Sequence, residues 1–229
     1  FTRNNPAFSA PRLLTWHVPS GNRQRAYDLI DRSAAADASH PTGTVVFAHT
    51  TDINRNVRWP RYEQSVFATQ FLPTSPTQEI IVSNDIANRP DLMGHMIGRR
   101  TEPASLFTNT FAPGSLADHL TSFGGQLRGS SQMDILTWIE AGASASYGTV
   151  IEPCNYLQKF PDPRVHFWYA RGFSAAEAYL MSVANPYQGV IVGDGLCQPF
   201  AHPPLLSVTG LTTNETVSGM LDLNLQADA

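Results

Sequence analysis

Short apolar runs alternate with segments of helical periodicity over most of the chain. Runs rich in β-branched residues and bounded by Gly, Pro or polar residues are typical of buried strands. They cover residues 13–18, 43–49, 79–83, 147–151 and 188–193. Apolar spacing of the helical kind predicts helices over 22–36, 59–72, 131–141 and 174–183. Residues 92–97 fit either a strand or a short helix, and residues 105–111 fit a further strand.

This alternation favours an α/β protein with three α/β/α layers and a mostly parallel central sheet. We expect the strands near residues 43, 79, 145 and 188 to run in the same direction. The chain divides into an N-terminal arm, residues 1–12, a core domain, residues 13–200, and a C-terminal β extension, residues 201–229. Residues 205–208 and 217–225 read as strands and form the start of that small β appendage.

Three Ser-x-x-acid spacings predict helix starts, at residues 115–118, 131–134 and 174–177. In this spacing the hydroxyl and the carboxylate each satisfy a free N–H of the first turn. Asp118 is therefore most simply a helix cap. Gly142 is well placed to end the second of these helices.

Composition narrows the class of protein and its partners. With 229 residues and 42% hydrophobic content, the chain is long enough for one large domain. Its net charge of −4 comes without a basic run, which argues against a nucleic-acid partner. No apolar run approaches the roughly 18 residues that span a bilayer. The first residue is Phe1, so we expect an upstream portion to have been removed or not represented.

Polar residues gather in the segments that follow the predicted strands, at 50–58, 112–125, 152–163 and 194–199. Ligands of open α/β sheets bind beyond the carboxyl ends of the strands. We therefore expect one edge to collect the following side chains: Asp52, Arg55, Asp118, His119, Ser122, Glu152, Cys154 and Asp194. Asp52, Arg55, Glu152 and Asp194 are the ligand-binding candidates among them.

His119 and Cys154 form a possible thiol–imidazole pair, in which the imidazole stabilises the thiolate and later protonates the leaving group. Ser122 is an alternative nucleophile, although its Thr-Ser-Phe-Gly-Gly setting differs from the Gly-x-Ser-x-Gly turn of hydrolases. The competing interpretation makes His119 a structural residue. It makes Cys154 a buried small residue or a half-cystine, with Cys197 as its partner in an oxidising compartment.

The sequence gives weaker indications of a metal site or an anion site. Asp118, His119, Glu152 and Asp194 offer nitrogen and oxygen donors for a hard metal ion or an anion site. No metal-ligand spacing accompanies them, so neither a metal nor a cofactor is predicted. The loop residues Arg55 and Arg58 either grip a carboxylate or phosphate or lie on a solvated loop.

Four segments resemble an uncharacterised family of secreted bacterial proteins. They are ADHLTSFGG at 117–125, GASASYGTVIEPC at 142–154, QKFPDP at 158–163 and VGDGLCQP at 192–199, together with the short EAY at 177–179. Residues 192–199 depart from the family pattern, which usually has Gly-Asp/Glu-Pro-Leu there. The resemblance runs from about residue 13 to residue 199. It implies a secreted, periplasmic or cell-surface location. Members of that family are longer at the N-terminus, which implies that Phe1 begins a fragment, a processed chain or an incomplete part of the chain. The resemblance brings no established activity.

A more distant resemblance is to the caspase-like fold of gingipain-type cysteine peptidases. There the nucleophile follows a central strand, and the next unit is a helix followed by Gly-Ala-x-Ala, which residues 140–148 resemble. The nucleophile position then falls near residues 118–122, where there is no cysteine, and Cys154 comes one strand too late. The His-Gly signature is also missing. This resemblance implies a peptidase fold that lacks the catalytic cysteine–histidine pair of the peptidases.

The sequence therefore favours a secreted or cell-surface caspase-like protein that acts as a binding or structural component of an extracytoplasmic assembly. Its expected partner is an N-terminal fragment of the same precursor or another subunit. The alternative is a hydrolase that uses His119 with Cys154 or with Ser122.

Overall fold

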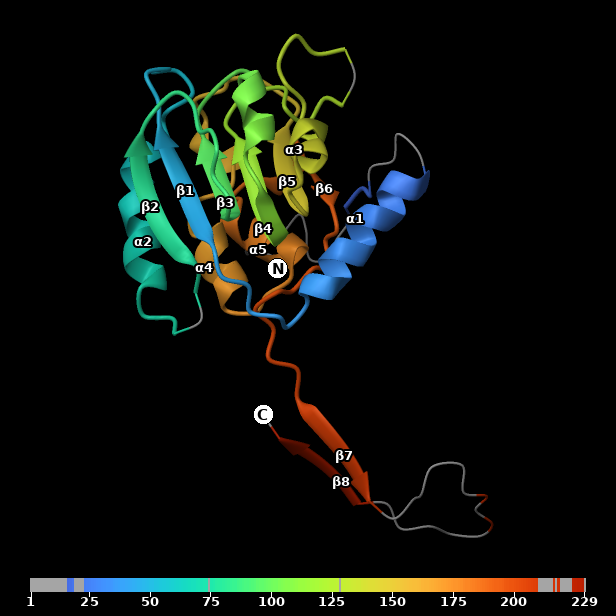
Figure 1. The fold of residues 1–229 in the computed structure, drawn as a ribbon. Helices are drawn as coiled ribbons and strands as arrows, with labels where there is room; N and C mark the ends of the chain where they lie inside the picture. The colour runs from blue at the N-terminus through green and yellow to red at the C-terminus, as the bar shows by residue number, and fades with distance from the viewer. Residues whose placement is uncertain are drawn as a thin grey trace, which may run out of the picture.

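Six strands form one mixed sheet in a computed structural model of the chain (Figure 1). The structure describes residues 16–18, 23–73, 75–127, 129–209, 216, 218 and 224–228. The strands are β1 Thr44–His49, β2 Thr77–Val82, β3 Leu92–Ile97, β4 Phe111–His119, β5 Ala145–Thr149 and β6 Gly189–Gly193. They lie in the order β2-β1-β3-β4-β5-β6.

The first five strands are parallel and β6 is antiparallel to β5. The prediction of a mostly parallel α/β sheet is confirmed. The expectation that the strand near residue 188 runs with the others is wrong. The pairing shows the reversed direction: Ala145 at the start of β5 pairs with Gly193 at the end of β6, and Thr149 at the end of β5 pairs with Gly189 at the start of β6.

Helices lie on both faces of the sheet (Figure 1). They are α1 Arg23–Ala36, α2 Tyr62–Thr69, α3 Leu136–Ala141, α4 Val165–Ala170 and α5 Ala175–Ser182. Helices α2, α4 and α5 cover one face, and α3 and α1 lie on the other. Arg32 of α1 donates to the carbonyl of Ala143 over 2.8 Å and so ties α1 to the end of α3.

Side chains of alternating strand positions enter two separate apolar cores. In β1, Val45 and Phe47 point to the α2 side, where Phe47 stacks on Tyr62 with ring centroids 4.9 Å apart. Val46 points to the opposite side and joins the cluster around Trp138 of α3. A strand buried on both faces needs a continuous apolar run, which explains the sequence of β1.

Two predictions about the region of the central strand β4 are wrong. Residues 105–111 were expected to form a strand, but Ala104–Thr108 is a 3-10 turn (η3) and β4 begins at Phe111. Ser115 and Asp118 were expected to cap a helix, yet both are buried inside β4. Parallel pairing with β3 and β5 on either side makes this segment a strand. The ambiguous residues 92–97 are β3, which is buried throughout.

Of the helix ends predicted from local signals, the start of α5 and the end of α3 are confirmed, and the start of α3 is wrong. At the start of α5 the Ser174 hydroxyl accepts from the N–H of Glu177, whose carboxylate accepts from the N–H of Ser174, so this predicted cap is confirmed. The cap predicted at 131–134 is wrong, because α3 begins at Leu136 with Ile135 as its N-cap, and Asp134 Oδ1 accepts from the N–H of Leu136 instead. Gly142 ends α3 with φ 117°, as predicted.

The C-terminal strands β7 Leu205–Thr209 and β8 Asn224–Asp228 form a separate antiparallel pair. The first was predicted at its observed position. The second was predicted over 217–225, most of which lies outside the described residues. The predicted arm, 1–12, also lies outside them, and of the predicted strand 13–18 the described part makes one bridge, His17 with Val192.

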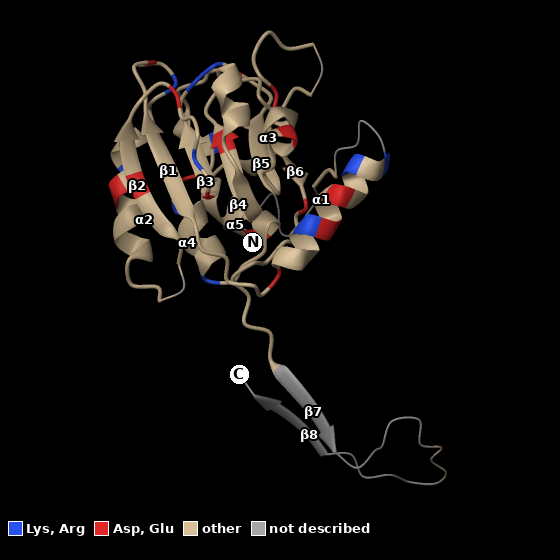
Figure 2. Cartoon of the chain, in the orientation of Figure 1, with Lys and Arg blue, Asp and Glu red and all other residues tan. Residues whose placement is uncertain are grey.

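No helix in the described part of the chain has the length and apolar character that crossing a membrane requires. Charged residues of both signs are spread over the fold, with the two signs side by side along α1 (Figure 2). Both cysteines are free thiols, so the possible bridge between Cys154 and Cys197 is absent.

Candidate functional site

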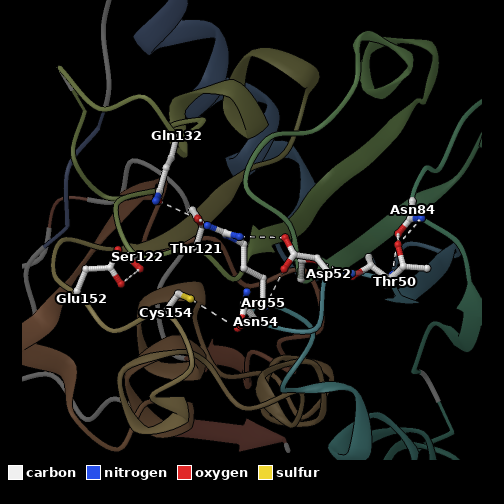
Figure 3. Close-up of polar contacts among 12 residues, drawn as sticks. Thr50, Asp52, Asn54, Arg55, Asn84, Thr121, Ser122, Gln132, Glu152 and Cys154 are labelled. Carbon is white, nitrogen blue, oxygen red and sulfur yellow. Dashed lines mark hydrogen bonds and ion pairs between the residues drawn. The ribbon is translucent and has the colours of Figure 1, made fainter.

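Loops from three parallel strands meet at the carboxyl edge of the sheet. They follow β1, β4 and β5 and carry several of the predicted site residues. Figure 3 shows Asn54, Arg55, Ser122, Glu152 and Cys154 close together in this region. Open α/β sheets bind ligands at this edge.

Arg55 connects the loop after β1 to the loop after β4. Its Nη1 lies 3.0 Å from Asp52 Oδ2, and its Nε donates to Thr121 Oγ1 over 3.1 Å. The Thr121 hydroxyl in turn donates to Gln132 Oε1 over 2.8 Å. A Cβ on Gly98, at the end of β3, would lie 2.2 Å from the carbonyl oxygen of Arg55, so glycine is required for this close approach.

Ser122 and Glu152 join the loops after β4 and β5. The buried Ser122 hydroxyl donates to Oε2 of the exposed Glu152 over 2.5 Å. Cys154, two residues further on, is partly exposed, and its thiol lies 3.6 Å from the carbonyl oxygen of Asn54. These contacts hold the β5 loop against the loops after β4 and β1.

Lys159 is a site residue that sequence reasoning missed. It ends the 3-10 turn Leu157–Lys159 (η4), it is buried, and its ammonium donates to the carbonyl of Ile151. Burial lowers the pKa of Lys159, and the charges of Glu152 and Cys154 oppose that shift. The sequence did offer one indication of this site residue: Lys159 is the only lysine in the chain and lies five residues after Cys154.

Asp118 and His119 are neighbours in β4 and therefore point to opposite faces. Asp118 Oδ1 lies 2.5 Å from Arg58 Nη2, and both side chains are fully buried. Arg58 also donates to the carbonyls of Ile97 and Pro161. Burial raises the pKa of the Asp118 carboxyl, and the charge of Arg58 opposes the rise. The solvated-loop interpretation of Arg58 is wrong.

His119 is held at both ring nitrogens. The indole N–H of Trp138 donates to His119 Nδ1 over 2.9 Å, so Nε2 carries the proton and donates to the Met133 carbonyl over 3.0 Å. Burial lowers the pKa of His119 to about 4. The imidazole is therefore neutral and fixed, and neither nitrogen contacts Cys154 or Ser122 through a hydrogen bond.

Asp194 lies at the other edge of the sheet from Glu152. Because β6 is antiparallel, the residue after it returns to the amino end of β5, where the N–H of Asp194 donates to the carbonyl of Ser144. The four proposed oxygen and nitrogen ligands are thus divided among two faces and two edges. The described residues contain no group of three or more His, Cys, Asp or Glu that fits a metal ion.

A comparison of the chain with models of known protein families found no match. Searches of curated proteins and of solved structures found none either.

Proposed function

We propose that the protein is a non-peptidase binding component of an extracytoplasmic assembly, built on a caspase-like core. One observation carries the proposal: both ring nitrogens of His119 are occupied by Trp138 and Met133. The candidate nucleophiles have other partners, Asn54 for Cys154 and Glu152 for Ser122. A general base must be within hydrogen-bond reach of the proton it removes.

The carboxyl edge also has the surface character of a protein-binding site. Ile53, in the loop after β1, and Val82, at the end of β2, are each 84% exposed. Ile151, after β5, is 46% exposed, and the exposed Trp59 stacks on His49 with ring centroids 4.3 Å apart. Apolar and aromatic residues beside hydrogen-bonding groups are typical of interfaces. The proposed partner is another protein subunit of the assembly.

Site-specific photo-crosslinking tests this interface. A photoreactive amino acid at position 53 of the full chain, expressed in its native host, should yield a discrete product of higher mass. The control is the same substitution at Ile30, which is 40% exposed on α1 and distant from the carboxyl edge in the fold. Absence of a product from position 53, or equal products from both positions, would contradict the proposal.

Peptidase assays test the hydrolase alternative directly. We expect the purified protein to leave casein and fluorogenic peptides intact at neutral pH, with no change in His119→Gln. Cleavage by the unmodified chain that is lost in His119→Gln and in either Cys154→Ser or Ser122→Ala would establish the alternative instead.

A further inference from the structure

The outer edge of β2 has unpaired backbone groups. Within the described part of the chain, β2 is the first strand of the sheet and pairs with β1 alone (Figure 1). Thr77, at its start, and Ser83, just after its end, donate their N–H groups to the carbonyls of Gly43 and His49. Backbone groups of successive strand residues point to opposite sides, so every second residue between them faces away from β1. These outward residues are Gln78, Ile80 and Val82.

Strand β2 lacks the features that protect exposed sheet edges from pairing. Natural edge strands usually carry Lys, Pro or a bulge. The sequence of β2 is TQEIIV, and its pairing with β1 is regular along its whole length. Its charged residue, Glu79, forms an ion pair with Arg89. The opposite edge of the sheet differs, because His17 forms a bridge with Val192 of β6 there. The β2 edge is therefore the one that can accept a further strand.

Apolar side chains accompany this edge on the side of the sheet where α2 lies. The side chain of Gln78 accepts a hydrogen bond from α2, so Ile80 and Val82 point to the same side. They are 38% and 84% exposed. Helix α2 lies at the same margin of the sheet (Figure 1). Two exposed aromatic rings, with centroids 5.3 Å apart, are on and just after this helix: Phe67 and Phe71.

We propose that the β2 edge binds a second copy of this chain, as an antiparallel β2–β2 pair about a two-fold axis beside Ile80. In an antiparallel pair, residues with inward-pointing backbone groups face each other and exchange two hydrogen bonds. Ile80 of one copy faces Ile80 of the other, and Gln78 faces Val82. All the outward N–H and C=O groups of β2 then have partners, and two six-stranded sheets become continuous.

The charges and the symmetry of β2 favour a second copy over an unrelated strand. Gln78 and Val82 are equally spaced about Ile80, so the reversed strand presents the same set of backbone groups. Glu79 lies opposite Ile81 in this register, and no like charges face each other. The two-fold axis is perpendicular to the sheet, so both α2 helices and their exposed aromatic rings lie on one side of the junction. This dimer does not depend on the partner proposed for the carboxyl edge.

Analytical ultracentrifugation of the full chain tests the dimer. At micromolar concentration we expect twice the mass of one chain. Ile80→Pro removes an outward N–H and spares the bonds to β1, so the fold should be retained. The dissociation constant should rise about thirtyfold, because each copy loses one interchain hydrogen bond. Ile80→Lys is a second variant should Ile80→Pro fail to fold. Its matched control is Ile30→Lys, at a residue that is 40% exposed on α1, which should leave the dimer intact.

Disulfide trapping tests the register in a Cys154→Ser background. Ile80→Cys should crosslink two copies on mild oxidation, because facing Cα atoms about 5.5 Å apart suit a disulfide. Val82→Cys should not, although this position is more exposed, because the two Val82 residues are four positions apart along the pair, about 14 Å.

A monomer at micromolar concentration, a dimer unaffected by the Ile80 variants, or faster crosslinking through position 82 would overturn the proposal. Loss of the position-53 crosslink in a protein that still forms the β2 dimer would reject the binding function alone. A monomer that retains the position-53 crosslink to another protein would reject the dimer alone.

Discussion

The role of a side chain in β4 depends on the face of the sheet to which it points. Asp118 and His119 are adjacent in sequence, but Asp118 enters the side with Arg58 and His119 enters the side with Trp138. Each is buried and bonded to its own partners, so the two do not act as a unit. Both are therefore structural residues of the fold, and the candidate nucleophiles Ser122 and Cys154 lie in the loops beyond the strand ends.

Removal of the Asp118 carboxylate should destabilise the protein strongly. Asp118→Ala leaves the guanidinium of Arg58 buried without its countercharge, which typically costs about 3–5 kcal/mol. Urea unfolding followed by circular dichroism measures the loss. The matched control is Glu140→Ala, which breaks the exposed pair with Arg25 at 3.7 Å and should cost less than about 1 kcal/mol. Similar losses in the two variants would refute the buried-pair argument.

At the scale of elements, local signals succeed where the tertiary contacts agree with them, as at α5, where the N–H groups of Ala175 and Ala176 donate to the carbonyls of Cys197 and Gly195. The Ser174–Glu177 box starts α5, whose first turn needs partners for its free N–H groups. The same spacing at 115–118 lies between two parallel neighbours, and strand pairing prevails there. Identical local patterns thus give a helix start in one place and a buried strand in another.

Loss of the α5 cap should have a modest, local effect. Ser174→Ala removes the acceptor of the Glu177 N–H and should lower the free energy of unfolding by about 1 kcal/mol. Amide exchange at Glu177 should also become faster, because its N–H loses a partner. Thr101→Ala, at an exposed loop position, is the control and should change neither quantity appreciably. A Ser174→Ala variant indistinguishable from this control would show that the cap is dispensable.

At the scale of the whole molecule, the fold buries three neutral histidines around the sheet. Burial lowers the pKa of His95 to about 3, of His119 to about 4 and of His166 to about 3. Each takes up a proton near pH 6.5 once the chain unfolds. Glu102 has the opposite effect on the pH dependence of stability. Burial raises its pKa to about 7, so as the pH falls the folded protein takes up this proton before the unfolded chain does.

Stability should therefore fall as the pH is lowered from about 6.5 toward 4. Three histidines favour proton uptake by the unfolded chain, whereas Glu102, Asp118 and Asp194, whose pKa values burial raises, oppose it. The histidines set against Glu102 alone give a slope of about 2.5 kcal/mol per pH unit near pH 5.5, and the two aspartates reduce it. Urea unfolding at pH 7, 6 and 5 measures this slope. His166→Leu cannot take up the proton and should reduce the slope by about half. A stability that is constant or rises toward pH 5 would contradict the assignment of neutral buried histidines.

Local sequence patterns predicted the α/β class, most strand and helix positions, and the loops that contain Asp52, Arg55, Ser122, Glu152 and Cys154. Periodicity, caps and turn residues act within a few neighbouring residues, so these features are readable along the chain. Tertiary structure alone decided that residues 111–119 form the central strand and that β6 runs antiparallel, which moves Asp194 to the far edge. It also buried Arg58 and Lys159. Strand pairing and burial depend on residues far apart in sequence, which no local pattern specifies.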